Sequence, residues 1–196
     1  MLANRRILLG VSGSIAAYKS AALVRLLIKA EAEVQVILTP SASAFVTPIT
    51  LATLSKRPVL QGFIKDEQSG VWHNHVDLGL WADVLLIAPA SANTVGALAN
   101  GLCPNLLTAV YLSARCPTMV APAMDLDMYQ HPATQRNLER LRLDGVRVLE
   151  SPAGELASGL SGPGRMQEPE EIVRELEQLF ANEAGTSEGK KAEVKS

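Results

Sequence analysis

The sequence predicts an α/β domain with a single doubly wound parallel sheet flanked by helices. Two observations support this fold class. Short apolar runs alternate along the chain with segments of helical periodicity, and each run is almost continuously apolar, which is typical of strands buried on both faces. The apolar runs occupy residues 7–11, 34–38, 84–88, 118–121 and 146–149. A Rossmann-like order of strand and helix follows.

The elements are marked by their neighbours in the chain. The first strand leads through a short polar loop into a helix with leucines three and four residues apart. The second strand ends at Thr39, before a proline, and the third ends at Pro89. Further helices are predicted over residues 92–99, 106–112, 134–143 and 168–180. The last of these is predicted to begin at Glu-Pro-Glu-Glu, because proline and acidic residues are favoured in the first turn of a helix.

The length of 196 residues fits one domain, which we assign to residues 1–181. Residues 182–196 are poor in large apolar side chains and rich in Gly, Ser, Thr, Glu and Lys, so we expect a disordered tail or linker there. The first apolar run is too short for a signal-peptide core or a membrane span. No targeting segment is therefore expected.

Charge and cysteine content exclude several classes of partner. The formal net charge is −2 and no cluster of lysine and arginine is present, which argues against nucleic acid. Cys103 and Cys116 are far apart and lack the spacing of metal ligands, so no metal is expected. Two isolated cysteines suit a reducing compartment, and we predict the cytoplasm.

The loop after the first strand could bind an anion. It joins a strand to a helix, and free backbone N–H groups at a helix N-terminus suit a phosphate. A dinucleotide site would prefer GxGxxG here and an acid at the end of the second strand, whereas Gly10 and Gly13 form Gly-x-x-Gly and that strand ends in Thr39. The Gly-Lys-Ser/Thr of a nucleotide triphosphate loop is also absent.

Two later strands end in polar loops. Ser91, Asn93 and Thr94 follow the third strand at a helix N-terminus, where capping of backbone amides would explain them without a ligand. Residues 122–129 follow the fourth strand and contain two acids and two methionines. Ligands bind beyond the carboxyl ends of strands in such sheets, so this loop predicts a site; an acidic strand-to-helix turn is the alternative.

Five segments carry recognisable motifs in a fixed order. Residues 10–19 read GVSGSIAAYK, residues 89–94 read PASANT, and residues 74–78 contain a histidine; residues 122–128 match PxMNxxM except at one position, and residues 162–166 read GPGRM. Over about residues 5–180 the chain resembles the homo-oligomeric flavin-containing cysteine decarboxylases. Within that family it is most similar to the phosphopantothenoylcysteine decarboxylase domain of bacterial coenzyme A synthesis. A flavin prenyltransferase matches the histidine segment and residues 122–128 less well.

The resemblance implies a flavoprotein fold with FMN as cofactor. One FMN phosphate agrees with one anion-binding loop and no ribose-reading acid. The active site is implied to be completed by a neighbouring subunit of a trimer. The residues implied to hold FMN are Ser12, Gly13, Ser14, Thr39, Ser91, Asn93, Thr94 and Met124; those implied to bind substrate are Asp125, Met128 and Arg165; those implied to be catalytic are His75, Asp125 and Ser158.

The implied activity is the decarboxylation of 4'-phosphopantothenoylcysteine to 4'-phosphopantetheine. In the family's scheme the flavin oxidises the cysteine CH2–SH unit to a thioaldehyde, which accepts the electrons released with CO2. Reduced flavin then returns electrons to the enethiol. His75 is implied as base or positioning group, while His73 and His131 receive no role. A phosphopantothenoylcysteine synthetase, fused or separate, is the implied partner.

Two positions depart from the family pattern. Asp125 stands where the family usually has Asn, and an ionised carboxylate only accepts hydrogen bonds and repels a substrate carboxylate. Ser158 stands where full-cycle members carry a cysteine, whose thiol donates a proton more readily than an alcohol does. Two alternatives stay open: an oxidative decarboxylase of a peptide C-terminal cysteine that stops at the enethiol, and a flavin-binding subunit without activity.

Overall fold

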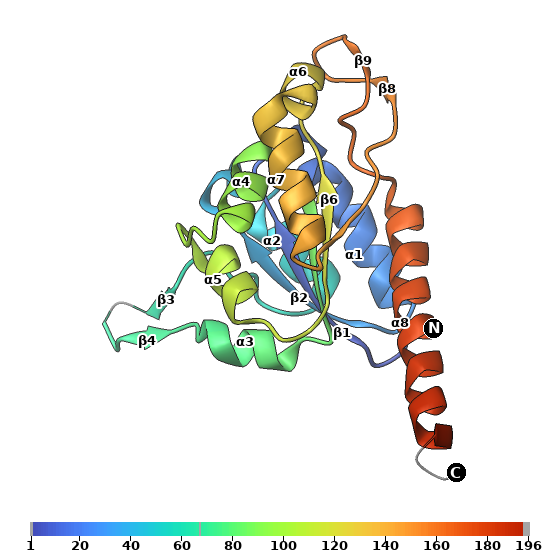
Figure 1. Ribbon diagram of the computed structural model, residues 1–196. Coiled ribbons are helices and arrows are strands. Elements are labelled where there is room, and N and C mark those ends of the chain that lie inside the picture. The colour runs from blue at the N-terminus through green and yellow to red at the C-terminus, as the bar shows by residue number, and fades with distance from the viewer. Residues whose placement is uncertain (1, 67, 194–196) are drawn as a thin grey trace.

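A parallel sheet of five strands forms the centre of the molecule (Figure 1). The computed structural model describes residues 2–66 and 68–193, with side chains for residues 2–64 and 68–182. Neighbouring strands are parallel throughout, in the order β2-β1-β5-β6-β7. The strands are β1 (Arg6–Val11), β2 (Glu33–Leu38), β5 (Val84–Ala90), β6 (Thr118–Pro122) and β7 (Arg147–Val148). The predicted fold class and strands are confirmed.

Helices cover both faces of the sheet, as expected for a doubly wound fold. Because successive side chains of a strand point to opposite faces, Leu9 and Leu86 pack on one side while Leu8 and Leu85 pack on the other. The first side is covered by α1 (Lys19–Lys29), α2 (Pro48–Ser55) and α8 (Pro169–Glu193), and the second by α4 (Ala92–Ala99), α5 (Leu106–Ser113) and α7 (Pro132–Leu143). The strand side chains are almost fully buried, which explains their continuous hydrophobicity.

The strand order places a crevice at β1 and β5. After β2 the chain returns to the opposite side of β1 and adds β5, β6 and β7 there, so the direction of winding reverses between β1 and β5. Loops diverge at such a switch point, and the space between them opens at the carboxyl ends of the strands. The loops singled out from the sequence all begin at these ends.

Several short helices and strands were not predicted, because the sequence shows no hydrophobic period over them. They are η1 (Ile15–Tyr18), η2 (Pro40–Ala44), the β3–β4 hairpin (Ile64–Asp66 and Val71–Trp72), α3 (His75–Trp81), α6 (Leu126–Gln130) and the β8–β9 hairpin (Gly154–Glu155 and Ser161–Gly162). Each has too few residues to show a period. Their ends are fixed by caps instead, such as Asn74 before α3 and Asp125 before α6.

The last helix is longer than predicted. It was expected to end at residue 180, where Ile172, Leu176 and Phe180 complete its buried face, but its backbone continues to Glu193. Several residues beyond that face are Glu, Ala and Lys, which have high helix propensity without apolar packing. Side chains of residues 183–196 lie outside the described part, and the boundary at residue 182 stays a prediction. Within the described residues, no helix has the length and hydropathy required to cross a bilayer.

Candidate active site

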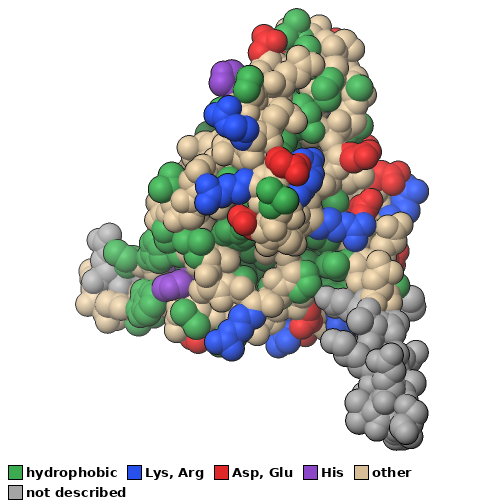
Figure 2. Space-filling view, in the orientation of Figure 1, with side chains coloured by type: hydrophobic (Ala, Val, Ile, Leu, Met, Phe, Trp, Pro, Cys, Tyr) green, Lys and Arg blue, Asp and Glu red, His purple; other side chains and the backbone are tan. Residues whose placement is uncertain are grey.

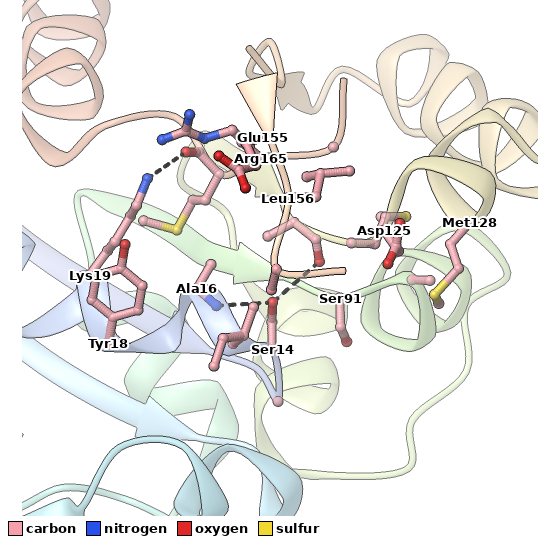
Figure 3. Close-up of a pocket in the computed structure, with 18 residues that line it drawn as sticks. Ser14, Ala16, Tyr18, Lys19, Ser91, Asp125, Met128, Glu155, Leu156 and Arg165 are labelled. Carbon is pink, nitrogen blue, oxygen red and sulfur yellow. Dashed lines mark hydrogen bonds between the residues drawn. The ribbon is translucent and has the colours of Figure 1, made fainter. Parts of the chain in front are cut away.

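A pocket of about 690 Å³ lies at the carboxyl ends of β1, β5 and β6. Four segments line it: the loop after β1 with η1, the start of α4, residues 123–128 after β6, and residues 155–166 around the β8–β9 hairpin. Figure 3 shows Tyr18 and Lys19 on one side of the pocket, Asp125 and Met128 on the other, and Ser14 between them. Segments far apart in the sequence therefore meet at the switch point of the sheet.

Ser12 supports the first loop from behind. Its side chain is fully buried and does not line the pocket. The Ser12 Oγ donates to the carbonyl of Pro89 at 2.8 Å and accepts from the backbone N–H of Ser91 at 2.8 Å. These two bonds join the loop after β1 to the loop after β5, so Ser12 holds the two walls in register.

Gly13 and Ser14 face the pocket directly. A Cβ on Gly13 would lie 2.4 Å from the Ser41 Oγ, so only glycine allows this close approach between loops. The Ser14 Oγ accepts from the N–H of Ala16 at 3.3 Å and lies 3.5 Å from the carbonyl of Ala123. Ser14 thereby caps η1 and presents a hydroxyl at the pocket wall.

The three predicted residues of the loop after β5 lie in different surroundings. Ser91 lines the pocket and caps α4, because its Oγ accepts from the N–H of Thr94 at 3.4 Å. Thr94 is buried behind Ser91, with its Oγ1 at 3.3 Å from the Ser91 Oγ. Asn93 lines a separate, more open hollow beside α4. The capping explanation thus holds for Ser91, which also reaches the pocket.

The third loop places Met124, Asp125 and Met128 at the pocket. The backbone N–H of Met124 donates to the carbonyl of Gly164 at 2.9 Å. Gly164 has φ of +135°, and a Cβ there would lie 2.5 Å from the Met124 carbonyl oxygen. Asp125 caps α6 by accepting from the N–H of Leu126 at 2.6 Å. This contact between residues 124 and 164 brings the end of the hairpin segment against the loop after β6.

The hairpin segment contributes Glu155, Leu156 and Arg165 to the pocket. Ser158 lies in the turn between β8 and β9, is exposed, and accepts from the N–H of Leu160 at 3.4 Å. Its neighbour Ala157 lines the pocket but Ser158 does not. The structure therefore puts the predicted catalytic serine beside the pocket, at the tip of the segment that overhangs it.

Lys19 is a pocket residue that the site prediction missed. Its side chain is buried although it carries a charge, and its Nζ donates to the Met166 carbonyl at 3.1 Å and to Glu168 Oε1 at 2.7 Å. Arg165 approaches the same carboxylate oxygen at 3.4 Å. A signal was present, because a lysine at the buried start of an amphipathic helix needs a partner. Tyr18, which is exposed, lines the pocket beside it.

Asp125 and Glu155 differ from the other charged groups of the pocket. Within the described residues neither carboxylate forms an ion pair, whereas Lys19 and Arg165 both lie against Glu168. The two acids stand on different sides of the pocket, because Glu155 lies beside Arg165 whereas Asp125 lies across from Lys19 (Figure 3). In the described part of the chain no three metal-ligating side chains come together.

Two more predicted residues, Thr39 and His75, do not line the pocket. Thr39 is buried at the end of β2, with its Oγ1 at 3.3 Å from the Ser41 Oγ, and so stands behind the first loop. His75 begins α3, which precedes β5 and lies at the other end of the sheet from the loops that form the pocket (Figure 1). A single chain therefore does not bring His75 to the other site residues.

Comparison with known proteins agrees with this geometry. The family model described as Flavoprotein matches residues 1–181. The coenzyme A biosynthesis bifunctional protein CoaBC of Bacillus subtilis is 46% identical over 191 residues, which cover 97% of this chain and 47% of that protein. A cysteine/cysteine sulfinic acid decarboxylase from an unknown prokaryotic organism is 60% identical over 136 residues, covering 69% of this chain and 38% of the relative. This chain thus spans less than half the length of both relatives.

The solved structures give the same assignment. A PPC decarboxylase mutant complexed with pantothenoylaminoethenethiol superposes with a TM-score of 0.80 at 36% identity, covering 91% of this chain and 99% of that one. The FMN-dependent cysteine decarboxylase SpaF superposes with a TM-score of 0.74 at 34% identity, covering 85% and 93%. The expected cofactor is confirmed at the level of the family, and so is the resemblance inferred from the motifs. This chain belongs to the Flavoprotein family, among relatives that are decarboxylases.

Proposed function

We propose that this chain catalyses the FMN-dependent decarboxylation of 4'-phosphopantothenoylcysteine to 4'-phosphopantetheine in coenzyme A biosynthesis. The observation that carries the proposal is the single pocket in which the loops after β1, β5 and β6 meet the β8–β9 hairpin. A relative that matches 97% of this chain is a coenzyme A biosynthesis protein by name. We propose a cytoplasmic location and, as partner enzyme, a phosphopantothenoylcysteine synthetase.

The pocket fits a flavin with one phosphate. Its volume lies within the range of about 300–1,000 Å³ that is usual for cofactor sites. Gly13 keeps the first loop free of a Cβ, and the hydroxyls of Ser14 and Ser91 stand at the wall. These residues, with Met124, would hold FMN; Ser12, Thr39 and Thr94 would support them from behind. When bound, FMN supplies the two-electron oxidation that lets a cysteine carboxylate lose CO2.

The other residues of the pocket would bind the substrate and exclude water. Lys19 and Arg165 would bind the anionic part of a substrate on their wall of the pocket, in competition with Glu168, which pairs with both, and with Glu155 beside Arg165 (Figure 3). Leu156, from the hairpin, stands over the opening between that wall and Asp125 and would exclude water (Figure 3). Met128 contributes apolar surface on the Asp125 side.

We further propose that His75 exchanges a proton in the pocket of a neighbouring copy. Within one chain it lies outside the pocket, and the surface around it is apolar: Val76, Leu80 and Leu112 are each exposed by about half. Figure 2 shows hydrophobic side chains gathered over α3 and the β3–β4 hairpin. Exposed apolar patches of this kind mark interfaces. A homo-oligomer, a trimer or a multiple of trimers, would cover the patch and complete the site.

Free cysteine is a second candidate substrate. The carboxylate of Asp125 forms no ion pair among the described residues and suits a cationic group, and free cysteine carries an α-ammonium where phosphopantothenoylcysteine carries an uncharged amide. A relative 60% identical over 136 residues is a cysteine/cysteine sulfinic acid decarboxylase by name. Asp125, which departs from the family pattern, would then be the ammonium partner.

Mass analysis of the products separates these functions. The FMN-loaded protein is incubated in turn with phosphopantothenoylcysteine, with cysteine and with a peptide that ends in cysteine. Loss of CO2 alone from the first substrate supports the main proposal, and the same loss from cysteine supports the second. Loss of CO2 with two hydrogens, from the peptide, would support the oxidative alternative. A flavin-loaded protein that converts none of the three would refute the decarboxylase proposals.

A further inference from the structure

The backbone of His75 is fixed by two neighbouring groups. The Asn74 Oδ1 accepts from the N–H of Val76 at 3.0 Å and caps α3 one residue before the histidine. The Ser113 Oγ, from α5, lies 3.2 Å from the His75 carbonyl oxygen and shares its one proton between this carbonyl and those of Ala109 and Val110, at 3.0 and 3.1 Å. The main chain at His75 is thus anchored to the body of the domain, and only the side-chain torsions remain to be set.

Two aromatic rings of the β3–β4 hairpin flank the imidazole. The Phe63 ring lies edge to face with it, at 86° and 6.3 Å between centroids, and the Trp72 ring is tilted by 52° at 5.9 Å. The backbone N–H of His73 donates to the carbonyl of Phe63 at 2.7 Å, which keeps the two ends of the hairpin together beside the histidine. Pairing within the hairpin therefore places both rings beside the His75 side chain.

One imidazole nitrogen of His75 lies inside the protein surface. Nδ1 is buried and has no hydrogen-bond partner among the described residues. Buried polar atoms are normally paired, so an unpaired one reports an orientation that the surroundings impose. A buried Nδ1 is shielded from a group of a neighbouring chain, which leaves Nε2 as the candidate for such a contact.

The Phe63 and Trp72 rings are partly exposed to solvent. Phe63 is 36% exposed and Trp72 is 52% exposed, so neither belongs to the core clusters of the sheet. A tryptophan left half in solvent contributes little burial for its size. Trp72 pairs with Ile64 in the hairpin ladder, and its ring contact among the described residues is with His75. Packing of the core therefore does not explain why large rings occupy these positions.

We propose that Trp72 and Phe63 are positioning residues that lock the His75 imidazole in one orientation, with Nε2 as the nitrogen available for proton exchange. The proposal rests on the proposed function, in which His75 exchanges a proton at the pocket of a neighbouring copy. It adds the reason why the hairpin carries aromatic side chains. It also identifies which nitrogen of His75 reacts.

Three variants of the hairpin test the proposal in the FMN-loaded protein. Trp72→Ala removes the ring, Trp72→Phe keeps an aromatic ring, and Val71→Ala changes the adjacent residue of β4, whose side chain points to the opposite face. The first readout is the side-chain ¹H–¹⁵N NMR spectrum of the histidines, with His75 assigned by His75→Asn. The second is the split between kcat and KM on the substrate that the product analysis identifies.

The expected results are specific to the Trp72 ring. His75 should show one tautomer and one orientation in the wild-type, Trp72→Phe and Val71→Ala proteins, and an averaged signal in Trp72→Ala. A misplaced catalytic group lowers the rate by up to about a hundredfold, so kcat of Trp72→Ala should fall about tenfold to a hundredfold while KM changes little. If Trp72→Ala does not fold, Phe63→Leu provides the same comparison.

Two outcomes would overturn the proposal. One is a His75 spectrum that Trp72→Ala leaves unchanged. The other is an altered spectrum with an unchanged kcat, which would show that the orientation has no part in catalysis. A wild-type protein that converts no substrate would instead defeat the proposed function, and the NMR comparison would still decide whether Trp72 orients His75.

Discussion

Replacing Asp125 by asparagine removes a charge from the pocket with little change in structure. The Asp125 Oδ1 caps α6 by accepting from the N–H of Leu126 at 2.6 Å. Asparagine keeps an oxygen in that place and ranks with aspartate as an N-cap, so α6 should persist. The variant differs from the wild type in one negative charge and in a new amide donor. The effect of the substitution on catalysis therefore shows whether a positive or a negative group of the substrate lies beside Asp125.

The size of the effect follows from the surroundings of the carboxylate. A hydrogen bond to a charged group contributes about 1.5–3 kcal/mol to binding or stability. Asp125 is half-buried in a pocket open to solvent, so the lower part of this range applies. Loss of about 1.5–2 kcal/mol corresponds to a factor of about 10–30. For free cysteine, kcat/KM should fall by this factor, since the ammonium loses its partner.

Phosphopantothenoylcysteine should respond in the opposite direction. It has no ammonium beside its carboxylate, so Asp125 can only repel that carboxylate, and asparagine would donate to it. We expect kcat/KM for this substrate to rise in Asp125→Asn. Where the wild type accepts only one of the two substrates, the sign of the change for that substrate identifies the group beside Asp125.

The assay compares kcat/KM for both substrates in three proteins. Asp127→Asn is the matched control, because Asp127 lies on the same short helix but is exposed and does not line the pocket. It should leave both values unchanged. A change of less than about threefold in both values for Asp125→Asn, equivalent to about 0.65 kcal/mol, would refute the placement of Asp125 against the reacting end of the substrate.

Three further substitutions test contacts that hold the sheet and the pocket loops. Asp83→Asn should lower the melting temperature at neutral pH, because Arg6 donates to this carboxylate from its side chain at 2.9 Å and from its backbone at 2.8 Å. Burial raises the pKa of Asp83, but the hydrogen bonds from Arg6 outweigh it and lower the pKa overall. The stabilisation is then present above the ordinary value of about 3.9 and lost as the pH falls through the folded-state pKa, so the two melting curves should converge in acid; a constant difference would contradict this. Gly164→Ala should cost about 1–3 kcal/mol and weaken FMN uptake, because its φ of +135° excludes a side chain beside Met124; flavin absorption and thermal melting measure both, and unchanged values would contradict the geometry. Ser12→Ala should cost about 1 kcal/mol, since the half-buried N–H of Ser91 loses its acceptor, whereas the Pro89 carbonyl still accepts from the backbone N–H of residue 12 at 3.2 Å; an unchanged melting temperature would show that the two loops do not depend on this bridge.

Burial made the sheet predictable from the sequence. Strands β1, β2, β5 and β6 are inside the molecule on both faces, so their residues form almost continuous apolar runs, and these runs are too short for a buried helix. Parallel strands also end at a common edge, which is why loops far apart in the sequence could be expected to meet. Ser14, Ser91 and Asp125 do meet in one pocket.

The supporting contacts could not be predicted in the same way. Ser12 and Thr94 belong to the predicted loops, but whether a hydroxyl faces the ligand or the loop behind depends on side-chain directions that periodicity does not give. Lys19 reaches its partner Glu168 across 149 residues of sequence, and no local pattern connects them. The β3–β4 hairpin is too short and too exposed for an alternation of polar and apolar residues.

The pocket and His75, the two parts of the proposed site, are held in place by different kinds of contact. The pocket rests on strands whose register is fixed by burial, so Ser14, Ser91 and Met124 are held by the core itself. His75 rests on a capped helix and a hairpin at the surface, where few buried contacts fix a side chain. A surface histidine would lose its defined orientation unless neighbouring groups restrained it, and the rings of the hairpin supply that restraint without belonging to the core. If neighbouring copies complete the site, the same exposed apolar surface both orients the histidine and provides the contact that carries it to the next pocket. Assembly and orientation would then depend on one surface, so a change in the hairpin should affect catalysis before it affects the stability of the fold.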